Sequence, residues 1–218
     1  MTLDNRVEDY ISEAEVWAER GSMTAMESCL NLAQRDSEAS TRDINSEPKV
    51  VALKEKGYKK ACLENIEGAR KYAGEGEASV MVACLDLSKQ YGSKVGIDFS
   101  KEIAEIEKVG YKNAALANLE SATQWVAKGN CSAMETCLAL ANGYALKVGI
   151  DVSKEIAEIE KVGYKNGVPA ELKVAREWAA KGDRAVMEAC LTIAVKYAKH
   201  VGMDIRKEAD EIRQIVNK

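Results

Sequence analysis

The sequence predicts an all-α protein: an α-solenoid, or superhelix, of four tandem three-helix repeats of about 53 residues each. One tract, GIDFSKEIAEIEKVGYKN at residues 96–113, returns at residues 149–166 with a single change, Val152 in place of Phe99. Shorter motifs recur at the same spacing along the whole chain. Helix-favouring Ala, Glu, Lys and Leu are abundant, and only 2 of the 218 residues are proline.

A motif that recurs in every unit predicts two helices joined by a tight turn. In the third unit it reads ATQWVAKGNCSAMETCLALA, residues 122–141. The aromatic residue is expected to fill the space between the two helices, and the methionine, cysteine and leucine share one helix face, which predicts the core. The recurring positions are Trp17, Tyr72, Trp125 and Trp178; Gly21, Gly76, Gly129 and Gly182; Met26, Met81, Met134 and Met187; and Cys29, Cys84, Cys137 and Cys190.

Glycines are expected to end the first and second helices of each unit. The recurring glycine of the motif can adopt the left-handed conformation that stops a helix. The second helix is expected to run out near a further set of glycines, Gly96, Gly149 and Gly202. An aspartate follows each of these two residues later and is well placed to cap a third helix; these are Asp98, Asp151 and Asp204.

The link between the third helix and the next unit is short. Gly110 and Gly163 are predicted to close the third helix, and Asn113 and Asn166 are plausible starts for the next one. Pro169 fits the first turn of that helix in the fourth unit. The alternative is that the third helix and the following first helix form one kinked rod, and the sequence leaves both possibilities open.

The units are expected to form a single helical-repeat domain, residues 1–218, divided at about 1–57, 58–110, 111–163 and 164–218. The first unit departs from the others after Gln34. Its tract RDSEASTRDINSEPK is polar and contains Pro48, so a mobile loop and a shortened third helix are predicted there.

The first two helices of each unit resemble a tetratricopeptide repeat. In the fourth unit the matching positions are Ala175, Trp178, Gly182, Met187, Leu191 and Ala194. The chain departs from the family in having methionine where alanine is usual, in lacking the closing proline, and in its longer period, which adds a third helix. The resemblance covers about half of each unit and implies a superhelix with an inner groove for a peptide or a helix of another protein.

By the same resemblance, the groove would be lined by first-helix positions two and five residues before the aromatic. The predicted partner-binding residues are Glu15, Arg70, Thr123 and Arg176 at the first position, and Ser12, Glu67, Glu120 and Lys173 at the second. Their charges differ from copy to copy, acidic at the start of the array and basic at its end, whereas the core positions stay the same. A groove graded in this way would suit an extended peptide or a partner helix.

Nothing in the sequence indicates catalysis, a cofactor or a metal. The glycines form no phosphate-binding motif, and the one histidine, His200, is expected to have a surface or packing role. The six cysteines do not have the spacing of metal ligands, and the four recurring ones are expected to be small buried residues in a reducing compartment. We therefore expect no enzymatic activity.

The overall charge also narrows the expected partners. The net charge of −4 and the pI of about 5.4 argue against nucleic-acid binding. No leader or long apolar stretch is recognisable, so we expect no membrane association and a cytoplasmic location.

The leading prediction is a non-enzymatic scaffold that binds a protein or peptide. One alternative is a structural module that self-associates through apolar faces of its end units; another is a small-molecule binder or enzyme of unknown type.

Overall fold

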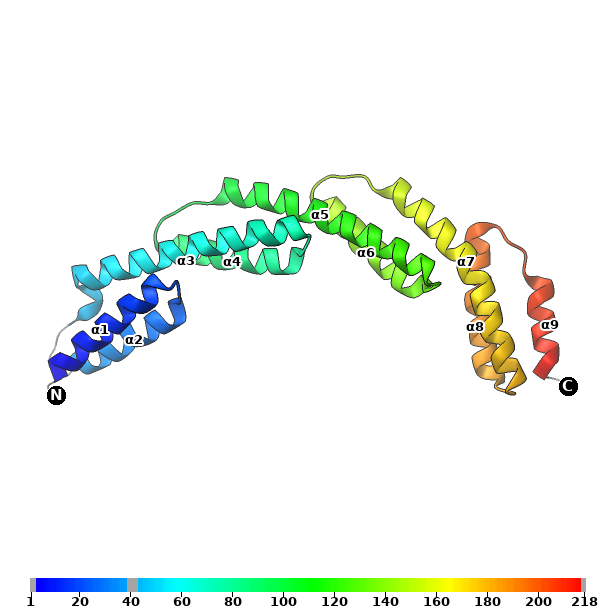
Figure 1. Ribbon diagram of the computed structural model, residues 1–218, viewed down its shortest axis with the longest axis horizontal. Coiled ribbons are helices and arrows are strands. Elements are labelled where there is room, and N and C mark those ends of the chain that lie inside the picture. Colours follow the sequence, from blue (N-terminus) through cyan, green and yellow to red (C-terminus); the bar gives the residue numbers. More distant parts are fainter. Residues whose placement is uncertain (1–2, 39–42, 217–218) are drawn as a thin grey trace. The chain divides into compact units, whose positions relative to one another are not determined.

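The computed structural model describes residues 3–38 and 43–216, and within these ranges it confirms the all-α prediction (Figure 1). The described residues form nine α-helices and one short 3₁₀ helix, and no strand. The helices are α1 (Leu3–Glu19), α2 (Met23–Glu38), η1 (Ile44–Ser46), α3 (Pro48–Glu75), α4 (Ala78–Lys94), α5 (Ser100–Ala127), α6 (Cys131–Lys147), α7 (Ser153–Ala180), α8 (Arg184–Val201) and α9 (Arg206–Val216).

Three of the helices are long because the third helical segment of one unit continues into the first segment of the next. Each of α3, α5 and α7 has 28 residues. The predictions that Gly110 and Gly163 end a helix and that Asn113 and Asn166 begin one are therefore wrong, since α5 and α7 run through all four residues. Pro169 also lies inside α7 and not in its first turn.

Close packing explains these glycines better than helix termination does. A Cβ atom at Gly110 would overlap Sδ of Met81, and one at Gly163 would overlap Sδ of Met134. Both methionines are completely buried, which confirms their predicted place in the core. In a helix interior a glycine costs stability relative to alanine, and here it makes room for a methionine from the neighbouring short helix.

The predicted glycine turns at the ends of the other segments are confirmed. The recurring hairpin glycines have left-handed backbone angles, with φ of 69°, 76°, 70° and 77° at Gly21, Gly76, Gly129 and Gly182. The glycines that follow the short helices have φ values of 67–68°, again in the left-handed region, at Gly96, Gly149 and Gly202. In this region a side chain other than that of glycine is strained, so these positions require glycine.

The aspartates that follow those glycines lead into the next helix as predicted. The Oδ1 atoms of Asp98 and Asp151 each accept a hydrogen bond of 2.9 Å from the backbone N–H of the first helical residue of α5 and α7. Asp204 accepts the corresponding bond from Arg206 at 3.1 Å. The Arg206 side chain also bonds to this carboxylate and lowers the pKa of Asp204 to about 2.

The irregular part of the first unit is more helical than expected. Helix α2 continues to Glu38, and α3 begins directly at Pro48, where a proline in the first turn is well tolerated. Between them, Ile44 of η1 is fully buried. The prediction of a loop is therefore wrong at residues 35–38, 44–46 and 48–49, which are helical, and its mobility is not tested. Residues 39–42 of the tract lie outside the described ranges.

The chain divides into two compact units, Met1–Gly110 and Tyr111–Lys218, at one of the predicted repeat boundaries. In the first compact unit, α1 packs on α2 and on α3, and α3 packs on α4 (Figure 1). In the second compact unit, α7 packs on α8 and also contacts α6 and α9. Each unit has its own cluster of buried apolar side chains. The prediction of a single domain spanning residues 1–218 stays a prediction.

Candidate functional site

All eight predicted partner-binding residues are exposed on the long helices or on α1. Ser12 and Glu15 lie on α1, Glu67 and Arg70 on α3, Glu120 and Thr123 on α5, and Lys173 and Arg176 on α7. Two of them, Glu15 and Arg70, line hollows in the surface of the first compact unit. The structure therefore places the predicted positions on accessible faces, and their role in binding stays a prediction.

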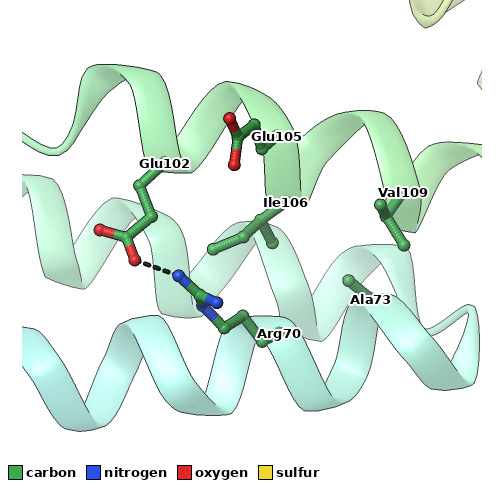
Figure 2. A pocket seen from close by; sticks show the side chains of 6 residues that line it. All are labelled: Arg70, Ala73, Glu102, Glu105, Ile106 and Val109. Carbon is green, nitrogen blue, oxygen red and sulfur yellow. Dashed lines mark hydrogen bonds and ion pairs between the residues drawn. The ribbon is translucent and has the colours of Figure 1, made fainter.

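Arg70 lines a hollow of about 300 Å³ between α3 and α5. We call it the second hollow, because a corresponding hollow between α1 and α3 comes earlier in the chain. Its apolar wall is formed by Ala73 of α3 with Ile106 and Val109 of α5, and Glu102 and Glu105 stand along its rim (Figure 2). The Arg70 guanidinium crosses to form an ion pair with Glu102. Val109 is 51% exposed, so part of the apolar wall is open to solvent.

Glu15 lines the corresponding hollow between α1 and α3, which we call the first hollow and which measures about 230 Å³. Its lining residues occupy the same repeat positions as those of the second hollow. They are Glu15, Ala18, Lys49, Ala52, Leu53 and Lys56, in the places of Arg70, Ala73, Glu102, Glu105, Ile106 and Val109.

The two hollows share part of their apolar wall and differ in the placement of their charges. Where the first hollow has Glu15 and Lys49, the second has Arg70 and Glu102. The alanine at the base is unchanged, and Leu53 is replaced by the equally apolar Ile106. Equivalent positions of the fold therefore form two recesses whose charged side chains are arranged differently.

The recurring tryptophans pack against the buried clusters of their compact units and remain partly exposed. Trp17, Trp125 and Trp178 are each only half-buried, and a cation from the hairpin turn lies over each ring. The distances from the cation to the ring centroid are 5.1 Å for Arg20 over Trp17, 4.5 Å for Lys128 over Trp125 and 4.3 Å for Lys181 over Trp178.

A cluster of tyrosines that the sequence-based predictions did not include joins successive repeats. In the first compact unit, the Tyr58 ring of α3 stacks on Tyr91 of α4 with centroids 6.0 Å apart. Tyr58 donates a hydrogen bond to Glu27 of α2, and Lys94 donates to the same carboxylate at 2.7 Å. These two hydrogen bonds, Lys94 first, lower the pKa of Glu27.

The second compact unit repeats this cluster with one substitution. Tyr164 of α7 stacks on Tyr197 of α8 at 5.2 Å and donates a 2.9 Å hydrogen bond to Glu135 of α6. His200 takes the position of Lys94 and stacks on Tyr164 with centroids 4.6 Å apart, in agreement with its predicted packing role. The recurrence of tyrosine at residues 58, 111 and 164 and at residues 91, 144 and 197 is the sequence signal that would have identified this cluster.

The tyrosine cluster should make the second unit sensitive to alkali. Burial raises the pKa of Tyr197 to about 12, and burial followed by the bond to Glu135 raises that of Tyr164 even further. Unfolded tyrosine ionises near pH 10, so the stability contributed by the neutral phenols is complete below about pH 10 and is lost as the pH rises toward 12. We expect urea unfolding midpoints, followed by circular dichroism, to fall more steeply over this range in the wild type than in a Tyr164→Phe/Tyr197→Phe variant. Equal slopes would show that these phenols do not control alkaline unfolding.

The cysteines have packing roles in this structure, and all six are free thiols. Of the four recurring ones, Cys29 and Cys190 are buried and Cys84 and Cys137 are half-buried. Cys131 is also buried, and burial raises the pKa of its thiol, which makes it a poor nucleophile. Among residues 3–38 and 43–216, no group of three or more His, Cys, Asp or Glu residues is placed to hold a metal ion.

The comparisons with known proteins add no relative. No family model, curated protein or solved structure matches the chain. Within the described ranges, no helix combines the length and the apolar character that crossing a bilayer would require.

Proposed function

We propose that this protein is a non-enzymatic scaffold that binds a protein or peptide along its helical repeats. The observation that carries the proposal is the pair of equivalent hollows that share an alanine and a large aliphatic residue and differ in the charges around them. A repeat whose packing is kept while its exposed charges change is suited to recognising different segments of one partner. The finer architecture, a solenoid of four repeats similar to tetratricopeptide arrays, is part of this proposal.

Each hollow would accept one side chain of the partner. In the second hollow, an apolar stem would lie against Ala73 and Val109, and a basic end group would reach Glu105 at the rim. In the first hollow, Lys49 and Lys56 form ion pairs with Glu8 and Glu19, and an acidic group of the partner would compete for these lysines. The partner segment is therefore expected to carry both apolar residues and charges of both signs. The free thiols agree with a reducing compartment, and we propose the cytoplasm.

Selection from a random peptide library would test this function directly. We expect the immobilised protein to enrich peptides that combine apolar and charged residues. Binding of these peptides should weaken at least about tenfold when Glu105 is changed to Lys or when Lys173 and Arg176 are both changed to Glu, since each change reverses charge on the proposed surface.

A matched control separates the hollows from general electrostatics. Lys199→Glu changes an exposed charge on α8, at a position outside the proposed surface, and should leave peptide affinity unchanged. A peptide with reversed charges should regain binding to the Glu105→Lys variant. If no peptides are enriched, or if the control weakens binding as much as Glu105→Lys does, the scaffold proposal is wrong.

A further inference from the structure

The hairpin formed by residues 111–147 has far fewer charges than its counterparts. It contains five charged residues, Lys112, Glu120, Lys128, Glu135 and Lys147, whereas the equivalent segments 58–94 and 164–200 contain eleven each. Charged side chains keep the surface of a helix soluble and discourage association. Their depletion in one hairpin is therefore expected of a surface that another molecule covers.

The depletion is sharpest on the outward face of α6. The exposed residues of this helix are Ser132, Thr136, Ala139, Leu140, Asn142, Gly143, Leu146 and Lys147. Only Lys147, at the very end, is charged, and its Nζ atom lies 4.3 Å from the ring centroid of Tyr111 within the same unit. Leu146 is 71% exposed and Leu140 is 47% exposed. At the same positions α4 has Ser93 and Leu87, and α8 has Lys199 and Ile193.

Gly143 lies between these two leucines and has no role in the packing of its own chain. A Cβ atom at this position would meet no heavy atom within 4 Å. Unlike the turn glycines, Gly143 is not among the residues with positive φ. Glycine in a helix interior is unfavourable, and the equivalent residues in α4 and α8 are Gln90 and Lys196. A backbone from outside the chain that approaches α6 closely would account for it.

We infer that α6 packs against α6 of a second copy of this chain, with Leu140, Gly143 and Leu146 at the centre of the contact. A two-fold axis brings identical residues together, so any charge near the axis would face its own copy and be repelled. Apart from Lys147 at the end of the helix, the outward face of α6 has no exposed charged residue, so it avoids this repulsion. A different protein could place opposite charges against a charged face, which an identical copy at the two-fold axis cannot do, so neutrality matters more for self-association than for a heterologous contact.

One helix from each copy makes a small interface. A helix of 17 residues is about 25 Å long, so the contact lies at the low end of specific interfaces. The association should therefore depend on concentration. It is separate from the proposed peptide-binding residues, because those lie on α1, α3, α5 and α7 and none of them lies on α6.

Sedimentation velocity across a concentration series tests the inference. We expect the wild-type mass to rise from 23.8 kDa toward twice that value. Leu146→Glu and Leu140→Glu should each weaken dimerisation at least about tenfold, because each buries two like charges at the axis. Leu87→Glu, at the position on α4 that matches Leu140, should leave the dimer unchanged. Circular dichroism would verify that every variant is folded.

Gly143→Ala is a second test, in which the substitution should stabilise the monomer and still weaken the dimer. It should raise the thermal midpoint of the monomer, because alanine is the better helix former, and it should weaken dimerisation because its methyl group separates the two helices. The inference is overturned if the wild type remains a monomer at every concentration, or if Leu146→Glu dimerises as strongly as the wild type. The inference would also be overturned if the wild type stays a monomer but binds a different protein, and Leu146→Glu abolishes that binding. The face of α6 would then contact a heterologous partner.

Discussion

Gly110→Ala should destabilise the first compact unit by about 1–3 kcal/mol, although alanine is the better helix former. Gly110 lies within α5, and a Cβ atom there would overlap Sδ of Met81 and lie 3.2 Å from the Cβ atom of Ala73. Met81 is fully buried, so its side chain has little room to move aside. Urea unfolding followed by circular dichroism would measure the change in unfolding free energy.

Gly74→Ala is the matched control for this effect. Gly74 also lies in a long helix, α3, but a Cβ atom there would meet nothing within 4 Å. This substitution should be neutral or stabilising by up to about 1 kcal/mol. In a Met81→Ala background, Gly110→Ala should lose most of its cost, because the new methyl group then enters the space that the methionine vacated. A Gly110→Ala variant as stable as Gly74→Ala would contradict the packing explanation.

Pro169→Ala should stabilise the second compact unit by about 3 kcal/mol. Pro169 lies in the interior of α7, where it has no N–H group to bond to the carbonyl of Lys165, and its ring crowds that carbonyl. Its side chain is exposed, so alanine would restore the hydrogen bond without loss of buried contacts. Thermal and urea unfolding would measure the gain, and hydrogen exchange of the amides in α7 would locate it.

The equivalent position in α5 supplies the comparison for Pro169. Leu116 is 52% exposed, and Leu116→Ala should change stability by less than about 0.5 kcal/mol, since both residues are good helix formers. A gain of less than about 1 kcal/mol from Pro169→Ala would show that water or a local change in helix geometry already compensates for the missing bond.

The local motifs were reliable guides where a residue acts through its own backbone or its own helix face. The left-handed turns at Gly76 and Gly129 follow from the conformational freedom of glycine at a helix end. The aspartates before α5 and α7 bond to amides only two residues away. The buried methionines follow from the helical spacing of apolar residues. Each of these features depends on neighbours in sequence, so the pattern contains the information that is needed.

The sequence predicts one side of the candidate site but not the residues that face it. The exposed positions of Glu15 and Arg70 were predicted, but the residues opposite them, Lys49 and Glu102, come from the next long helix along the chain. The tyrosine cluster is similar, since Glu27 and Tyr58 lie on helices α2 and α3. Which side chains meet across two helices depends on how the helices pack, and the spacing within one helix does not report this.

The glycines show most clearly which features follow from the amino-acid pattern and which depend on tertiary packing. The composition and the repeat of about 53 residues are sufficient for an all-α chain, its hairpins and its core positions. They do not distinguish Gly129, which ends α5, from Gly110, which lies inside the same helix. That difference comes from Met81 on α4, which occupies the space beside Gly110. Whether a glycine stops a helix or accommodates a neighbour is decided by the side chain that packs against it, and only the tertiary structure brings the two together.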